Sequence, residues 1–298
     1  MISAASKASL LSRIEDLKQI PTIPAVLAPL LRYLEQPLED IDVQKVTEMI
    51  AQDKSLAAQC LQMANSALFG SRQKIESIRG AVMGLGFQRV SDIAMSCGVL
   101  NLTPKGCPGL DPVVFWEHSL GCALVCRHFA RKISYADPGK AYLAGLLHDL
   151  GIIVNLWTLP REFGEAFELA RREGIPLHEA EEQCFGFTHC DSGRLLAERW
   201  DLAPELREVV SRHHNLDESS EHAGLVALVE LSDLLCRMTG LGHGFIEARQ
   251  VSFFEQKGFA VLSKQYNSLA QLDWARLTFE LDSYMDEVRT LVRTIYRQ

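Results

Sequence analysis

The sequence predicts an all-α fold, and three features of the 298-residue chain support this prediction. Apolar residues recur at the three- and four-residue spacing of amphipathic helices along most of the chain. Pro, Gly, Asp and Ser interrupt these stretches where helices are expected to begin and end. No stretch alternates apolar and polar residues as a half-buried strand does. We therefore expect an all-α protein built from many helices.

The N-terminal part is expected to contain several short helices. Asp42, Asp53 and Ser77 each precede an apolar helical pattern and are expected to cap its first turn. The predicted helices follow residues 10–17, 26–34, 43–51, 53–64 and 87–102, with a short one after Ser77 that Gly84 and Gly86 interrupt. Residues 103–112 contain three prolines and two glycines, which makes this stretch the clearest boundary in the chain. The first predicted segment is accordingly 1–105.

Longer helices are expected beyond this boundary. Residues 113–133 form the first, and 140–156 are apolar nearly all round, which indicates a central buried helix. Further helices are predicted over 161–173, 178–185, 191–200, from Pro204 to about residue 213, 225–237 and 273–296. We expect a metal-binding helical half over 112–240 and a C-terminal helical extension over 241–298.

Composition narrows the class of protein. The chain is 47% apolar and 23% charged, which is ordinary for a globular protein, and no apolar run or leader sequence indicates a membrane, so a cytoplasmic protein is expected. Residues 1–105 carry 11 basic and 10 acidic side chains, and the remainder carries 19 and 28. This acidic remainder would attract cations and repel a nucleic-acid backbone. The eight cysteines form no CxxC pair and are interpreted as buried free thiols.

Seven side chains of the metal-ligating type occur in the C-terminal two-thirds of the chain. Imidazole nitrogens and carboxylate oxygens are ligands that divalent transition metals take in proteins, and seven suffice for two ions that share a carboxylate. Each histidine taken alone is better interpreted as an ordinary core or surface imidazole, so the argument for metal depends on the set. The seven candidates are His118, His148, Asp149, His189, His213, His214 and Asp233.

The pair His148-Asp149 gives the strongest local argument for metal. Neighbours on a helix point about 100° apart, so the pair cannot chelate one ion, but a carboxylate with two oxygens can bridge to a second ion. The surrounding stretch is apolar, and burying a charged Asp there costs several kcal/mol unless a cation or strong hydrogen bonds compensate it. A helix cap or a buried hydrogen bond to backbone is the alternative for Asp149. The other histidines are interpreted as side chains without a role in the site: His128, His178, His222 and His243.

Residues 17–237 resemble an HDOD domain, the HD-related output domain of bacterial signalling proteins. In the first half the resemblance is carried by Ile20-Pro21-Thr22-Ile23-Pro24, Ile50–Leu56 and Ala64–Gly70. In the second half it is carried by Trp116-Glu117-His118-Ser119, Ala144–Gly151, Glu182, Phe185–His189 and Trp200–Pro204. The resemblance implies a multi-helical HD-type fold preceded by an N-terminal helical subdomain. HDOD domains are regarded as regulatory descendants of HD phosphohydrolases that often lack the metal ligands.

This chain keeps an order of ligands similar to that of the related HD-GYP phosphodiesterases of cyclic di-GMP. The likeness implies that Asp149 bridges two ions. It further implies two groups of ligands, His118, His148 and Asp233 toward one ion and His189, His213 and His214 toward the other.

Two departures from the HD-GYP pattern concern the substrate. Those enzymes follow the His-Asp with Gly-Lys, whereas here Gly151 precedes the apolar Ile152. The GYP signature expected after the double His is replaced by the acidic stretch Asn215–Glu221, which would repel the phosphates of a dinucleotide. The resemblance therefore implies a retained metal centre without the residues that handle the substrate.

Three functions follow as hypotheses. The first is a signalling module that binds one or two divalent ions (Fe, Mn, Ni or Zn) and acts through contacts with signalling proteins, with a second copy of the chain as a further candidate partner. The second is a metal-dependent phosphohydrolase acting on a small phosphorylated ligand, in which a metal-bridging hydroxide attacks phosphorus, Asp149 is catalytic, and Arg194 or Arg212 replaces the missing Lys. The third is a scaffold without metal.

Overall fold

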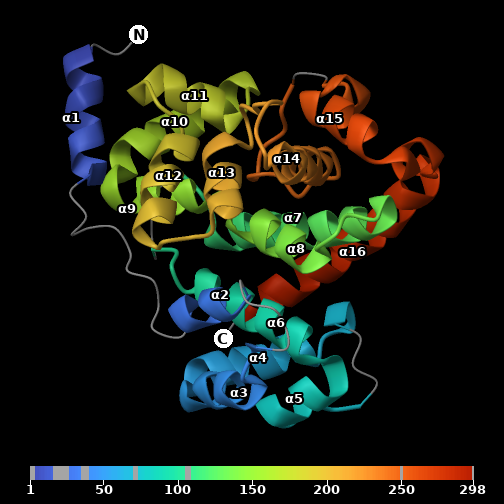
Figure 1. The fold of residues 1–298 in the computed structure, drawn as a ribbon. Coiled ribbons are helices and arrows are strands. Elements are labelled where there is room, and N and C mark those ends of the chain that lie inside the picture. Colours follow the sequence, from blue (N-terminus) through green and yellow to red (C-terminus); the bar gives the residue numbers. More distant parts are fainter. Residues whose placement is uncertain are drawn as a thin grey trace. The chain divides into compact units, whose positions relative to one another are not determined.

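The computed structural model describes residues 4–15, 27–34, 40–69, 73–104, 109–248 and 251–296. Within these ranges the regular structure is helical and contains no strand, which confirms the predicted all-α fold (Figure 1). Two parts of the family pattern, residues 20–24 and Gly70, lie outside the described residues, as does Cys107. Contacts divide the chain into two compact units, one of residues 1–21 and 103–281 and one of residues 22–102 and 282–298.

The unit of residues 22–102 and 282–298 contains short helices joined by tight turns. Asp42, Asp53 and Ser77 cap helices as predicted: their side-chain oxygens accept the backbone N–H groups of residues 45, 55 and 56, and 80. Gly86, at φ +87°, separates α5 from α6. The elements are α2 (Leu27–Leu34), α3 (Val43–Gln52), α4 (Lys54–Ala64), η2 (Ala67–Phe69), α5 (Ile78–Leu85), α6 (Phe87–Leu100) and the end of α16 (Trp274–Tyr296).

The other unit is built around α7 (Pro112–Ile133), which packs against α8 and α14, while α9 packs against α12 (Figure 1). Helix α1 (Ala4–Glu15) contacts α9 and α11, and its Arg13 donates to the carbonyl oxygen of Thr158 at 2.7 Å. The remaining elements are α8 (Pro138–Leu147), α9 (Leu150–Thr158), α10 (Pro160–Glu173), α11 (Leu177–Phe185), α12 (His189–Arg199), α13 (Pro204–Arg212), α14 (Ala223–Met238), η3 (Phe253–Glu255), α15 (Lys257–Gln265), η4 (Asn267–Gln271) and the start of α16.

The central apolar stretch differs from the prediction in one respect. A single helix was expected over 140–156, but α8 ends at Leu147 and α9 begins at Leu150, with His148 and Asp149 between them. By length and composition Pro138–Thr158 could cross a membrane, yet 94% of its most apolar window is buried inside the protein, as is usual for a core helix. His148 keeps helical backbone angles (φ −54°, ψ −39°), and the departure from the helix occurs at Asp149 (φ −93°, ψ 15°).

Candidate metal centre

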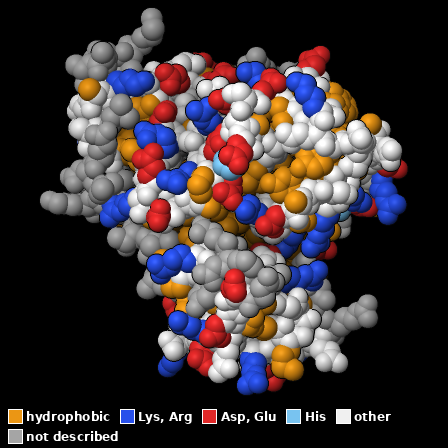
Figure 2. All heavy atoms as spheres, viewed as in Figure 1, with side chains coloured by type: hydrophobic (Ala, Val, Ile, Leu, Met, Phe, Trp, Pro, Cys, Tyr) orange, Lys and Arg blue, Asp and Glu red, His pale blue; other side chains and the backbone are white. Residues whose placement is uncertain are grey.

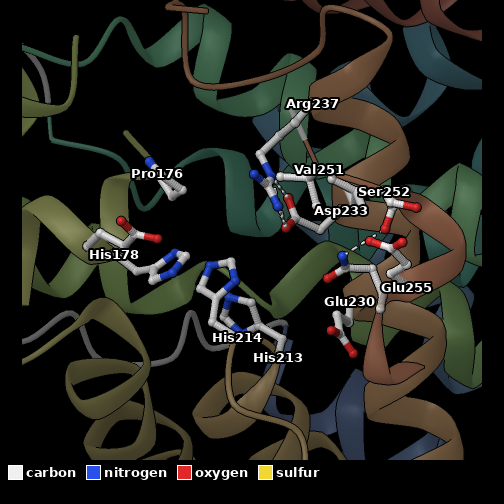
Figure 3. A pocket seen from close by; sticks show the side chains of 13 residues that line it. Pro176, His178, His213, His214, Glu230, Asp233, Arg237, Val251, Ser252 and Glu255 are labelled. Atoms are coloured by element: carbon white, nitrogen blue, oxygen red, sulfur yellow. Dashed lines mark hydrogen bonds and ion pairs between the residues drawn. The ribbon is translucent and has the colours of Figure 1, made fainter. Parts of the chain in front are cut away.

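All seven candidate ligands lie together within the unit of residues 1–21 and 103–281. They come from five places in the fold: the middle of α7, the α8–α9 break, the start of α12, the end of α13 and the middle of α14. Six of them are buried, and His214 is partly exposed. Figure 3 shows the face on which His213, His214 and Asp233 border a cleft.

Asp149 is at the centre of the cluster. Its Oδ2 lies 3.2 Å from His148 Nε2 and 3.4 Å from His118 Nε2. Its Oδ1 lies 3.3 Å from His189 Nε2 and 3.5 Å from His213 Nε2. Asp149 precedes α9 but makes no capping hydrogen bond, and its buried Oδ1 has no hydrogen-bond partner at all. The helix-cap alternative is therefore wrong for Asp149, and its carboxylate is left to the imidazoles around it.

The second nitrogen of these imidazoles fixes the orientation of each ring. His118 Nδ1 donates to Leu241 O at 2.6 Å, and His148 Nδ1 donates to Gly145 O at 2.8 Å, because a carbonyl oxygen can only accept. His213 Nδ1 lies 3.1 Å from a carbonyl oxygen in the same way. In each neutral ring the Nε2 then presents a lone pair to the centre of the cluster, an arrangement typical of metal-binding histidines.

The facing nitrogens require a positive charge between them. His118 Nε2 and His148 Nε2 are 3.3 Å apart, and His189 Nε2 and His213 Nε2 are 3.2 Å apart. Two lone pairs repel unless a proton or a cation lies between them. For an ion about 2.1 Å from each nitrogen or oxygen, neighbouring ligand atoms are about 3.0–3.4 Å apart. The cluster therefore has the spacing and the donor atoms that a divalent ion needs.

The ligand atoms fall into groups on the two sides of Asp149. His118, His148 and Asp233 form one group, and Asp149, His189, His213 and His214 form another, with the atoms in each group within 4.8 Å of one another. This is the grouping that the family resemblance implies. That these side chains hold metal stays a prediction.

Two charged side chains that are not themselves candidate ligands form hydrogen bonds with the ligands His189 and Asp233. Glu181, which is buried, accepts from both the backbone N–H and the Nδ1 of His189, at 2.8 and 2.7 Å. Its neighbour Glu182, which carries part of the family resemblance, is exposed. Arg237 donates to both oxygens of Asp233 at 3.1 Å and to Glu247 at 2.6 Å. These contacts fix the orientation of one ligand on each side of the cluster.

The site contains one histidine that the sequence analysis had set aside. His243 is buried and its Nε2 lies 3.0 Å from Asp149 Oδ2, so the interpretation of His243 as a side chain without a role in the site is wrong. His178, also set aside, stacks on His214 with ring centroids 4.1 Å apart. His128 lies outside the cluster, where its Nε2 forms a hydrogen bond with Glu280 Oε2 at 2.9 Å. The sequence around His243 shows only a glycine on each side, and this pattern does not indicate that Asp149, 94 residues earlier, is its partner.

The charges in the cluster shift the pKa values of its imidazoles. Burial by itself lowers the pKa of His118, but the hydrogen bonds and charges of Asp149 and Asp233 outweigh burial and raise this pKa well above its usual range. Burial also lowers the pKa of His213, but the Cys190 sulfur and Asp149 outweigh burial and raise this pKa to about 10. Without metal, protons therefore supply the positive charge that the carboxylates require.

A cleft of about 370 Å³ opens beside the cluster (Figure 3). Its described lining includes four carboxylates, the three imidazoles of His178, His213 and His214, and one guanidinium, that of Arg237, which is already paired with two carboxylates. The carboxylates are those of Glu179, Glu230, Asp233 and Glu255. On the molecular face in Figure 2, acidic and basic side chains are interspersed and do not form a broad basic area. The cleft is therefore better suited to a cation than to a phosphate.

The arginines expected to replace the missing Lys lie elsewhere. Arg194 pairs with Glu198 at 2.8 Å and Arg212 pairs with Asp217 at 3.1 Å, and both line a separate hollow on the surface. Ile152, at the position of that Lys, is completely buried. The expected replacement by Arg194 or Arg212 is thus not supported by their positions.

Comparisons with known proteins identify the family. The HDOD domain model matches residues 20–216. An HDOD domain protein of unknown function from Geobacter sulfurreducens has 28% identical residues, a TM-score of 0.83 and 98% coverage of both chains. A provisionally assigned phosphohydrolase from Shewanella amazonensis shares the fold, with a TM-score of 0.71 and 21% identity, over 96% of this chain and 98% of its own.

Two uncharacterised bacterial proteins are similar in sequence. One, from Treponema pallidum, is 28% identical over 77% of this chain and 44% of its own length. The other, YuxH of Bacillus subtilis, is 34% identical over 44% of this chain and 33% of its own length. The chain thus spans less than half the length of these curated relatives. With its all-helical fold and the match over residues 20–216, the chain belongs to the HDOD domain family.

Proposed function

We propose that this protein is a cytoplasmic regulatory module that binds one or two divalent metal ions at the Asp149 centre and acts through contacts with signalling proteins. The observation that carries the proposal is the convergence of four Nε2 atoms on the two oxygens of Asp149, one of which has no hydrogen-bond partner. Nitrogen and oxygen ligands in this combination suit iron, manganese, nickel or zinc.

A regulatory role is favoured over hydrolysis by the surroundings of the centre. Four carboxylates line the cleft, and the one guanidinium in its described lining, that of Arg237, is already paired. Ile152 can neither donate a proton nor neutralise a phosphate. An ion at this centre would instead connect five parts of the fold, so its binding would stabilise this unit and its outer surface.

Metal analysis of the purified protein tests this function. With an ion at a thousand times its dissociation constant, each site should add about 4 kcal/mol of stability, or a rise of roughly 10 °C in Tm. His148→Ala should lose both bound metal and this rise in Tm, because His148 Nε2 lies beside Asp149. His128→Ala, which removes an imidazole outside the cluster, is the matched control. A wild-type protein that melts at the same temperature with and without metal would contradict the proposal.

Metal binding is expected to release protons. In the metal-free protein the raised pKa values favour one proton on His118 and one between His189 and His213, whose Nε2 atoms are 3.2 Å apart. These protons must leave before the Nε2 atoms can bind an ion, so about two protons should be released per loaded centre. Calorimetry in buffers of different ionisation enthalpy measures this number. A binding enthalpy that does not depend on the buffer would contradict it.

The pH dependence of stability should reverse between the two states. A raised pKa in the folded protein stabilises it below the unfolded value near 6.5, and this stabilisation is lost as pH rises through the folded pKa, about 10 for His213. The Tm of the metal-free protein should therefore fall in the alkaline range. The metal-loaded protein should keep its Tm there and lose it in acid, where protons compete for the imidazoles.

Metal-dependent phosphohydrolysis is the second candidate, and the cleft at His213 and His214 favours it. Divalent ions would activate water and neutralise charge on a phosphoryl group, while Asp149 would hold them in place. Turnover of an aryl phosphodiester with manganese, iron, nickel or zinc, abolished by Asp149→Asn, would establish this activity. Failure with all four metals and with several nucleotides would leave the regulatory function.

A further inference from the structure

His243 lies in the segment between α14 and η3, beyond residues 20–216 that match the family model. It is buried, and its Nε2 is 3.0 Å from Asp149 Oδ2. Its ring centroid is 4.6 Å from that of His118. One ligand atom each from His118, Asp149 and His243 lies within 4.8 Å of the others, which is the spacing of side chains around a single ion.

The segment that carries His243 is held against the cluster on both sides of this residue. On one side, Leu241 O accepts from His118 Nδ1, and Leu241 N donates to Cys236 O at 2.8 Å. On the other side, Glu247 accepts from Arg237, which also binds Asp233. The same segment thus supports His118 and Asp233 and brings its own imidazole to Asp149. Contacts between this segment and the cluster therefore fix the position of His243.

We propose that His243 is a fifth protein ligand of the ion on the Oδ2 side of Asp149. This inference rests on the metal binding proposed above. The ligands of that ion would be His118, His148, Asp149, Asp233 and His243. An octahedral ion with these five ligands, each binding through one atom, keeps one position for water, whereas four ligands would leave two. His243 would thus remove one of the two positions at which this ion could take a water or a substrate oxygen.

The consequence is a centre that the protein itself closes on one side. With His243 in place, a substrate oxygen and an attacking water cannot both bind the ion on the Oδ2 side. Metal binding would also fix residues 241–247 on the cluster, because His243 would be bonded to the ion directly. This segment would then be ordered by metal, which connects the buried centre to the surface around it.

Titration with Mn²⁺, followed by EPR and by water proton relaxation, tests this role. His243→Ala should weaken one Mn²⁺ site by about 10- to 100-fold and raise the relaxation per bound ion, because water enters the vacated position. In His243→Gln the amide can still donate to Asp149 Oδ2, but its only lone pairs are on oxygen. The nitrogen hyperfine couplings of the bound Mn²⁺, measured by pulsed EPR, therefore distinguish an imidazole ligand from a hydrogen-bond donor. His128→Ala is again the control for loss of an imidazole, and the Tm of each metal-free variant checks its folding.

The outcomes distinguish this inference from the proposed function. Equal losses in His243→Ala and His243→Gln, with His128→Ala unchanged, support His243 as a ligand. If the bound Mn²⁺ shows the same nitrogen couplings in His243→Gln as in the wild type, His243 only donates a hydrogen bond to Asp149 and the inference is overturned. Wild-type affinity in both variants overturns it as well, while loss of metal in His148→Ala would still uphold the metal centre. A wild-type protein that binds no ion overturns both.

Discussion

Replacing Asp149 with alanine is expected to abolish metal binding at both sides of the centre. Its two oxygens contact two imidazoles each among the candidate ligands, so no other residue in the cluster can connect the two groups. We expect an affinity loss of at least about 100-fold, more than for a residue that only supports a ligand. The rise in Tm that metal gives the wild type should disappear with it. Metal analysis and melting curves with and without added ion measure both effects.

Asp149→Asn is the matched variant for this experiment. It keeps the shape and one oxygen of the side chain but removes the negative charge, so it should also lose the metal. The pKa of His118, which Asp149 helps to raise, should fall toward its usual range in this variant. Retention of metal at wild-type stoichiometry by Asp149→Asn would show that the bridging charge is not required.

Gly151→Ala is expected to have the largest effect on folding. A Cβ atom at this position would lie 1.7 Å from His189 O and 2.7 Å from Gly193 N. Both are backbone atoms of α12, so α9 and α12 would have to move apart by more than an ångström. Overpacking of backbone against backbone belongs to the exceptional class of substitutions that cost more than about 4 kcal/mol. Because His189 begins α12, metal binding should fail together with stability.

Chemical denaturation of Gly151→Ala measures this cost, and Gly84→Ala provides the control. Gly84 lies in helix α5, where an added Cβ would meet no atom within 4 Å. Alanine there should stabilise the protein by about 0.4–1 kcal/mol, because it restricts the unfolded chain. Similar stabilities for the two variants would mean that the close approach of α9 and α12 is not needed.

Local physics explains the features of the fold that the sequence predicted. Asp42, Asp53 and Ser77 accept from backbone N–H groups two or three residues further along, so their roles depend only on neighbouring sequence. The break at His148 and Asp149 was missed because the apolar pattern continues through it. Hydrophobic periodicity records which residues are buried, and it does not record a two-residue turn inside a buried segment.

The candidate site was likewise predicted in part, and the rest of it required the structure. A buried carboxylate in an apolar segment indicated a partner of opposite charge, and the structure surrounds Asp149 with imidazoles. Glu181 and Glu182 could not be separated from sequence, because which of two adjacent residues faces His189 depends on the rotation of α11 against α12. The exclusion of Arg194 and Arg212 from the cleft also required the positions of their partners.

By itself the sequence determined the helical class of this protein and the chemical type of its site. Both follow from residue types and spacing, because helix periodicity and the affinity of imidazole and carboxylate for cations are local properties. The tertiary structure decided which nitrogen of each imidazole faces Asp149, which acidic groups line the cleft, and that His243 joins the cluster. These depend on contacts between residues as many as 123 positions apart, and such contacts are set by how the helices pack.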